Sequence, residues 1–416
     1  LDEGMTIPEA MEQAAAQMEA SGQFSSVEVG EDRLAVWAEF TNGWPFVLLG
    51  NRPKVADEVA TERAEEALMQ AGTAQAGGDA VELPDSENAV LLNGFANYRP
   101  ATDRAIDDID RMLSDSGYTV SQQACTVANL QNLGNAGVVS IHSHGYRAID
   151  LTNGFPILWV SDTYNQEQAN RFADLGFVEN DYIAIISTNE EDPNTGASVS
   201  VDGFAVTNVF IENEVSLPAN SFVISQSCFS GVQRLVDAWL AAGAGVYAGW
   251  DHNSAGDVQP KFLIDRMTGA NQYRPESPDR RPFDWKFAYT SLREKGLHQV
   301  TTDFGLFGGL AGDIDVTTAT LRLFSNNDTG IMAPTIQYLE MNEFDDQVIL
   351  HGVFGSEEGE VTVAGVTAGI DQWEPREIRA TIPRSGVGSA GPVKVRVRDH
   401  ESNVVNLTSW RIGFDY

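Results

Sequence analysis

The chain has 416 residues, 42% of them hydrophobic and 9% aromatic, and carries 60 Asp and Glu against 26 Lys and Arg, a formal net charge of −34. This composition excludes a disordered or fibrous protein, and the length predicts two or three domains. The acidic balance argues against nucleic acid or an anionic membrane as a partner, because both require basic patches. No apolar run in the sequence approaches the roughly 18 residues of a membrane-spanning helix.

Residues 1–85 are predicted to form a small N-terminal α+β unit, either an accessory domain or a pro-domain. Thr6-Ile7-Pro8 is typical of a helix start. Strand-like segments follow at residues 24–29, 34–40 and 45–50. A second helix is expected over residues 56–72, before a Gly-rich linker.

From Asn88 onward, strand-like and helix-like segments alternate, which predicts an α/β domain over residues 86–330. Strands are expected at residues 89–95, 138–141, 182–186, 222–224, 245–250 and 319–324, and helices at 102–113, 204–213 and 283–296. Residues 188–203 are interpreted as an acidic loop, and residues 259–282 as a polar surface insertion.

Residues 331–416 have a different character. Short strand-like segments are separated by turns rich in Gly, Pro and Asn, which is typical of an antiparallel β-sandwich. This region is predicted to be an independent C-terminal domain.

Reactive side chains follow two of the predicted strands. The apolar run 138–141 leads to His144 and Gly145, and the run 222–224 leads to Cys228. Because ligands bind beyond the carboxyl ends of parallel strands, neighbouring strands would place the imidazole and the thiol on one rim. A helix is expected to begin at Cys228 and to favour the thiolate. The backbone amides of Gly145 and Cys228 would then form an oxyanion hole.

These two motifs resemble those of the clan CD cysteine peptidases, which include caspases, legumains, clostripains and gingipains. The resemblance covers about residues 86–325 and rests on the segments IHSHG (141–145) and QSCFSG (226–231), in the order His then Cys. It implies a caspase-hemoglobinase-like, mostly parallel sheet flanked by helices. It also implies a protein or peptide substrate, Cys228 as nucleophile, His144 as general acid and base, and no required cofactor. Self-cleavage is frequent in the family, and the segments 188–203 and 259–282 are candidate sites.

The residues expected to line the substrate pocket are Ser143, Gln226 and Asp251. Clostripain-like members carry an acidic residue two positions before the cysteine, where this chain has Gln226. Asp251 is a candidate for the missing carboxylate, so cleavage after a basic residue stays an open alternative.

The C-terminal region resembles an IPT/TIG domain, an Ig-like module. The similar segments are 331–344, 348–366 and 388–397, with Trp373 between the last two. Such domains are usually spacers or binding modules, so this one is expected to bind protein or glycan rather than to act in catalysis. The whole chain is expected to be a secreted or surface-displayed protein whose signal peptide is absent.

Three alternatives stay open. The core could be catalytically inactive and act in adhesion or in glycan or protein binding. His142 and His144, with His252, could form a zinc site, and the acidic segment 188–194 could bind calcium. Cys125 is interpreted as a structural thiol, because no apolar strand precedes it.

Overall fold

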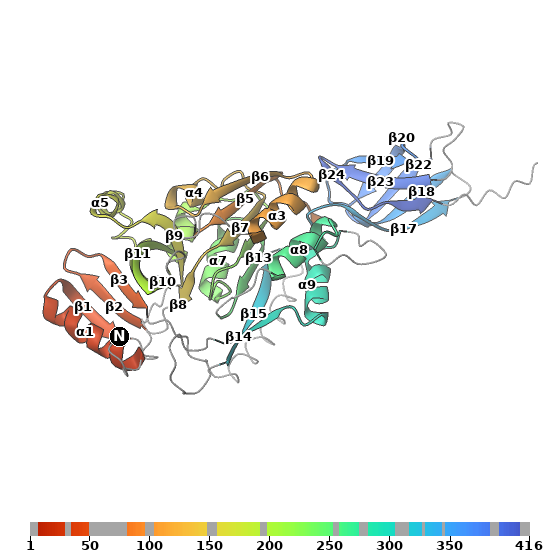
Figure 1. The fold of residues 1–416 in the computed structure, drawn as a ribbon. Coiled ribbons are helices and arrows are strands. Elements are labelled where there is room, and N and C mark those ends of the chain that lie inside the picture. Colours follow the sequence, from red (N-terminus) through yellow and green to blue (C-terminus); the bar gives the residue numbers. More distant parts are fainter. Residues whose placement is uncertain are drawn as a thin grey trace, which may run out of the picture.

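The computed structural model describes residues 7–29, 35–49, 81–95, 104–147, 156–191, 198–252, 258–273, 282–303, 316–326, 329–342, 346–382 and 391–407. These residues form a mixed α/β architecture with several β-sheets. Figure 1 shows an elongated molecule with the first strands at one end, a layered central region, and the C-terminal strands at the other end.

A seven-stranded sheet lies at the centre, in the order β14-β15-β13-β12-β7-β5-β6. The five strands from β13 to β6 are parallel, and β15 runs antiparallel to both of its neighbours. The strands are β5 (Asn88–Asn93), β6 (Thr119–Ala124), β7 (Val138–His142), β12 (Ser221–Ser225), β13 (Ala244–Trp250), β14 (Gln299–Asp303) and β15 (Val316–Ser325). The carboxyl ends of the parallel strands therefore share one edge.

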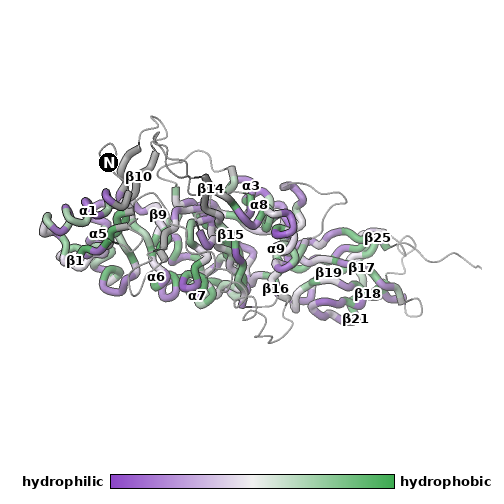
Figure 2. The backbone as a smooth tube through the Cα atoms, turned by 90° about the horizontal axis from the view of Figure 1, so that it is seen from below, coloured by the Kyte–Doolittle hydropathy of each residue, from purple (hydrophilic) through white to green (hydrophobic). Residues whose placement is uncertain are grey.

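Helices cover both faces of this sheet. They are α3 (Arg104–Asp115), α4 (Val127–Gln131), α6 (Asn208–Glu214), α7 (Gln233–Ala241), α8 (Val258–Thr268) and α9 (Trp285–Glu294). Successive residues of β7 point to opposite faces: Val138 packs in the cluster that contains Phe262 of α8, and Val139 in the cluster that contains Trp239 of α7. Figure 2 shows hydrophobic residues running through this central region. Burial on both faces explains why these strands are continuous apolar runs in the sequence.

A second seven-stranded sheet has the order β1-β2-β3-β10-β11-β9-β8. It contains β1 (Phe24–Val29), β2 (Ala35–Phe40), β3 (Pro45–Leu49), β8 (Gly145–Arg147), β9 (Pro156–Thr163), β10 (Ile183–Glu191) and β11 (Ser198–Thr207), with α1 (Ile7–Ser21) and α5 (Gln166–Asp174) nearby in the chain. Strand β3 pairs in parallel with β10, and the buried Trp44 ring lies 6.0 Å from the ring of Phe204. The N-terminal strands thus share a sheet with part of the predicted middle domain, and the boundary at residue 85 stays a prediction. The helix predicted over residues 56–72 lies outside the described residues.

The C-terminal region consists of two antiparallel sheets, as the sequence predicts for an all-β unit. One contains β17 (Thr335–Asn342), β18 (Gln347–Val353), β22 (Glu377–Thr381) and β21 (Gly369–Glu374). The other contains β20 (Val366–Thr367), β19 (Glu360–Val363), β23 (Gly391–Val397), β24 (His400–Glu401) and β25 (Val405–Leu407). Leu350 of β18 and Val395 of β23 belong to one buried cluster, so the two sheets share a hydrophobic core.

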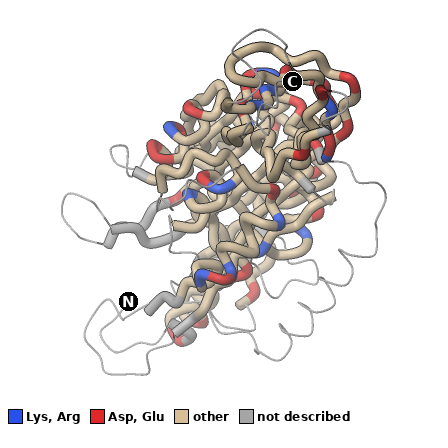
Figure 3. Tube along the Cα trace, turned by 90° about the vertical axis from the view of Figure 1, so that its right-hand side faces the viewer, with Lys and Arg blue, Asp and Glu red and all other residues tan. Residues whose placement is uncertain are grey.

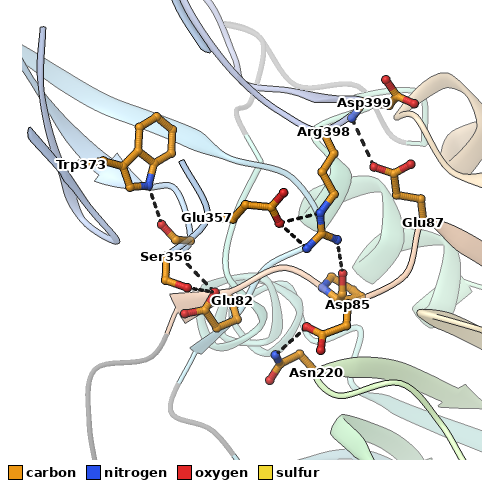
Figure 4. A network of polar contacts seen from close by, with 11 residues as sticks. Glu82, Asp85, Glu87, Asn220, Ser356, Glu357, Trp373, Arg398 and Asp399 are labelled. Carbon is orange, nitrogen blue, oxygen red and sulfur yellow. Dashed lines mark hydrogen bonds and ion pairs between the residues drawn. The ribbon is translucent and has the colours of Figure 1, made fainter. Parts of the chain in front are cut away.

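The segment before β5 joins the C-terminal sheets to the central sheet (Figure 4). It contains β4 (Val81–Glu82), which pairs in parallel with β16 (Thr329–Gly330). In the turn between β23 and β24, Arg398 Nη1–H donates to Pro84 O at 2.7 Å, and Arg398 Nε–H donates to Glu357 at 2.7 Å. The hydroxyl of Ser356 donates to the Glu82 carboxylate at 2.9 Å. These groups, together with His400, are called the joint; they come from four separate parts of the chain, residues 81–84, 329–330, 356–357 and 398–400.

His400 is a buried titratable group of this joint. It is 1% exposed, its Nδ1–H donates to Ser116 O at 2.8 Å, and its ring lies 4.5 Å from the ring of Tyr118. Burial lowers the His400 pKa below its ordinary 6.5; the hydrogen bond to Ser116 O and the charges of Glu87 and Asp399 oppose this shift, and Arg398 adds to it.

We expect the protein to lose stability as the pH falls from neutral through the lowered His400 pKa. In that window the unfolded chain takes up a proton on this histidine that the folded protein does not, so protonation favours unfolding. Melting temperatures between pH 7.5 and 5, about the range in which an ordinary histidine titrates, would test this for the wild type and His400→Gln. The variant should show a flatter pH dependence of the melting temperature than the wild type. An equal slope in the wild type and His400→Gln would contradict the assignment.

Three predictions are wrong: two segments expected at the surface and the start of one helix. The segment 188–203 is mostly sheet, because β10 and β11 form a hairpin whose register extends from Ile183↔Val206 to Glu191↔Ser198. The predicted helix 204–213 begins only at Asn208, because Phe204 and Val206 are buried strand residues. The segment 259–282 contains α8, whose residues Phe262–Thr268 are buried, so this part is not a surface insertion.

Charged residues are spread along the trace, with Lys and Arg interspersed among Asp and Glu in the view of Figure 3. Within the part of the chain that the structure describes, no helix is long and apolar enough to cross a membrane.

Candidate active site

The two motif-bearing strands are direct neighbours. Strands β7 and β12 pair in parallel, with Ser225 opposite Ile141, and the N–H of Gln226 donates to Ile141 O at 2.7 Å. The segments that carry His144 and Cys228 therefore leave the sheet at the same edge, as the sequence predicts.

Gly145 shows how closely these two segments pack. A Cβ atom built on this glycine would lie 2.0 Å from the carbonyl oxygen of Cys228 and 2.9 Å from Cβ of Ser227. Real Cβ contacts are longer than 3.0 Å, so the position has no room for a side chain. The segment after His144 thus lies against the backbone of Cys228.

The His144 ring lies among aromatic side chains that the sequence did not point to. The Phe95 ring is 4.6 Å away in an edge-on arrangement, and the Trp159 ring is 6.0 Å away. Phe95 also lies 5.0 Å from the ring of His142. Phe95 comes two residues after the end of β5, so its position at the carboxyl edge of the sheet is the one signal that could have indicated it.

Cys228 lies on a turn and is partly exposed. The expectation that a helix begins at the cysteine is wrong, because α7 begins at Gln233 with Val232 as its N-cap. Helix-dipole effects fall off within the first turn. The positive end of α7 therefore does not provide the proposed activation of Cys228.

Two of the three predicted pocket residues are buried. The Ser143 hydroxyl is directed inward and donates to Trp159 O at 2.7 Å. Gln226 is 6% exposed and continues the ladder between β12 and β7. In this structure Ser143 therefore links β7 to β9, and its role in a substrate pocket stays a prediction.

Asp251, the third predicted pocket residue, follows β13 and is held by several groups. Its carboxylate accepts the Thr320 N–H at 2.6 Å and lies 3.1 Å from an Arg322 guanidinium nitrogen. His252 Nδ1 lies 3.3 Å from the same carboxylate. A basic substrate side chain would therefore have to compete with Arg322 for Asp251. Arg322 could not be predicted from local sequence patterns, because its position depends on the pairing of β15 with β13.

The second cysteine, Cys125, has a different environment. It is fully buried, and burial raises the pKa of its thiol far above the ordinary value, with a smaller contribution from Asp162. Cys125 therefore stays a protonated thiol at neutral pH, and Cys228 is the partly exposed one of the two.

Among the described residues, no group of three or more His, Cys, Asp or Glu side chains is arranged to hold a metal ion. The acidic segment considered for calcium, residues 188–194, has side chains that lie outside the described residues.

Comparisons with known proteins provide little evidence about the family or activity of this chain. No protein-family model and no curated protein matches the chain. A matching solved structure is the gamma-CGTase of the alkalophilic Bacillus clarkii, with 23% identity over 23% of this chain and 15% of that enzyme, and a TM-score of 0.17. The chain thus spans a small part of that enzyme's length, and a match with this score carries no argument about fold or activity.

Proposed function

We propose that the protein is a cysteine endopeptidase of the clan CD type, with Cys228 as nucleophile and His144 as general acid and base. The observation that carries this proposal is the parallel pairing of β7 with β12 together with the contact of Gly145 with the Cys228 carbonyl. These features bring together the two residues that the resemblance selects. The mostly parallel sheet with helices on both faces supports a caspase-hemoglobinase-like core.

The proposed reaction has two steps. In the first, the Cys228 thiolate attacks the scissile carbonyl carbon, the C–N bond breaks, and His144 donates a proton to the leaving amine, which leaves a thioester. In the second, His144 takes a proton from water, the resulting hydroxide attacks the thioester carbon, and the thiolate departs. The N–H groups of Gly145 and Cys228 would stabilise the oxyanion in both steps.

We propose that the remaining regions of the chain are accessory to the peptidase core. The two C-terminal sheets with one shared core support an Ig-like IPT/TIG module. We assign it a spacer or binding role toward protein or glycan, in a secreted or surface-displayed protein. Selectivity for basic residues would require Asp251 to be released from Arg322, so we do not assign a preferred residue.

The proposal is tested by hydrolysis of a peptide library that varies the residue before the scissile bond. The wild type should cleave a subset of these peptides, and Cys228→Ala should have no activity above the uncatalysed reaction, because the nucleophile is lost. Cys125→Ala is the matched control: it removes the other thiol of the chain and should retain hydrolysis.

Two results would contradict the proposal. One is hydrolysis that persists in Cys228→Ala. The other is an inert wild type, including after limited proteolysis of the N-terminal region, which would favour the catalytically inactive adhesion or binding protein.

A further inference from the structure

The residue after the candidate nucleophile has an unusual backbone conformation. Phe229 has a φ of 55°, in the left-handed region that is strained for a residue with a Cβ atom. Strain of this kind persists only where the surrounding structure imposes it. The Cys228 turn, defined as residues 228–231, is therefore held in place by its neighbours.

Ser230 makes several of the contacts that hold this turn. It is 1% exposed, and its hydroxyl accepts the Trp250 N–H at 3.0 Å and donates to Ser225 O at 3.2 Å. The hydroxyl of the buried Tyr247 donates to Ser230 O at 2.9 Å. One serine thus links the end of β12, the turn, and the end of β13.

Backbone contacts connect the same turn to the end of β13. The Gly231 N–H donates to Trp250 O at 2.6 Å, and the Phe229 N–H donates to His252 O at 3.1 Å. A Cβ atom on Gly231 would lie 2.8 Å from Gly249 O, so the two backbones are in close contact. The Cys228 turn is therefore attached to β13 on one side, while Gly145 packs against it on the other.

We propose that Ser230 is a positioning residue: with the end of β13 it holds the strained Cys228 turn in the one conformation that directs the thiol toward the substrate. Ser230 contacts neither the substrate nor the reacting atoms in this role. The inference rests on the proposed peptidase function for its catalytic consequence, but the attachment of the turn can be measured without any activity.

Ser230→Ala should lower kcat by about 10- to 100-fold while KM changes little, because a displaced nucleophile impairs the chemical step more than substrate binding. Ser230→Cys keeps a side chain of similar size that forms only weak hydrogen bonds, so its loss of kcat should be intermediate. This variant replaces Ser230→Ala in the test if the alanine variant folds poorly. In hydrogen–deuterium exchange, the amides of Phe229, Gly231 and Trp250 should exchange faster in both variants than in the wild type.

The matched control is Ser221→Ala. Ser221 is equally buried and its hydroxyl also bonds backbone carbonyls, but it lies at the opposite end of β12 from the turn. Ser221→Ala should lower the melting temperature without changing kcat or the rate of amide hydrogen exchange in the Cys228 turn.

Unchanged exchange in the Ser230 variants would overturn the proposed attachment. Faster exchange with unchanged kcat, or an equal loss of kcat in Ser221→Ala, would overturn the positioning role. An inactive wild type would contradict the peptidase function itself, and the exchange comparison would still decide whether Ser230 holds the turn.

Discussion

Gly145→Ala is expected to abolish most peptide hydrolysis, by at least about 100-fold, while the protein stays folded. The added Cβ would lie 2.0 Å from the Cys228 carbonyl oxygen, so the segments after β7 and β12 must move apart. A displacement of about 1 Å between reacting groups is enough to lower a rate by about two orders of magnitude. The φ of Gly145 lies outside the left-handed region, so steric contact alone causes the effect.

The measurement is kcat/KM on the best peptide, together with the melting temperature. Gly134→Ala is the control, because the nearest atom to its added Cβ, Ser216 O, is 3.9 Å away. This variant should keep wild-type hydrolysis. Full activity in Gly145→Ala would mean that the contact between the two motifs is irrelevant to catalysis.

The largest effect on stability is expected from Asp265→Ala in α8. Asp265 is 0% exposed and forms an ion pair with Arg266, which is 1% exposed. Its carboxylate also accepts the N–H groups of Gln272 and Tyr273 at 2.6 and 2.9 Å. The substitution removes the carboxylate that pairs with the buried Arg266 guanidinium and accepts two backbone N–H groups. We expect the free energy of unfolding to fall by about 3–5 kcal/mol.

Denaturant unfolding of the wild type and Asp265→Ala measures this cost. Asp237→Ala is the control, because the Asp237 carboxylate is exposed and accepts only a surface hydrogen bond from Gln233 among the contacts of the described residues. It should change the unfolding free energy by less than about 1 kcal/mol. Similar small losses in both variants would show that the buried pair contributes little to stability.

The strands that lead to the candidate site could be predicted from the sequence. Burial on both faces gives β7 and β12 continuous apolar runs, and polar residues mark the points where the runs end. The alternating pattern of the C-terminal strands likewise reflects sheets with one buried face. These are local signals, and the structure agrees with them.

The parts that could not be predicted depend on contacts between distant residues. Helix α8 mixes the apolar run 262–264 with charged residues, and the burial of Asp265 and Arg266 as an ion pair depends on contacts that the sequence does not show. The pairing of Asp251 with Arg322 follows from β13 lying antiparallel to β15, with Gly249 opposite Arg322. The contact of Phe95 with His144 similarly depends on β5 lying beside β7.

The central claim is that Cys228 and His144 act together as nucleophile and base. Its most direct test is covalent labelling with a peptidyl chloromethyl ketone built on the best library peptide, followed by mass spectrometry of the intact protein and of its fragments. We predict one adduct per chain, located on Cys228, absent in Cys228→Ala and strongly slowed in His144→Ala. An adduct on another residue, or labelling of Cys228 at the same rate in His144→Ala, would contradict the claim.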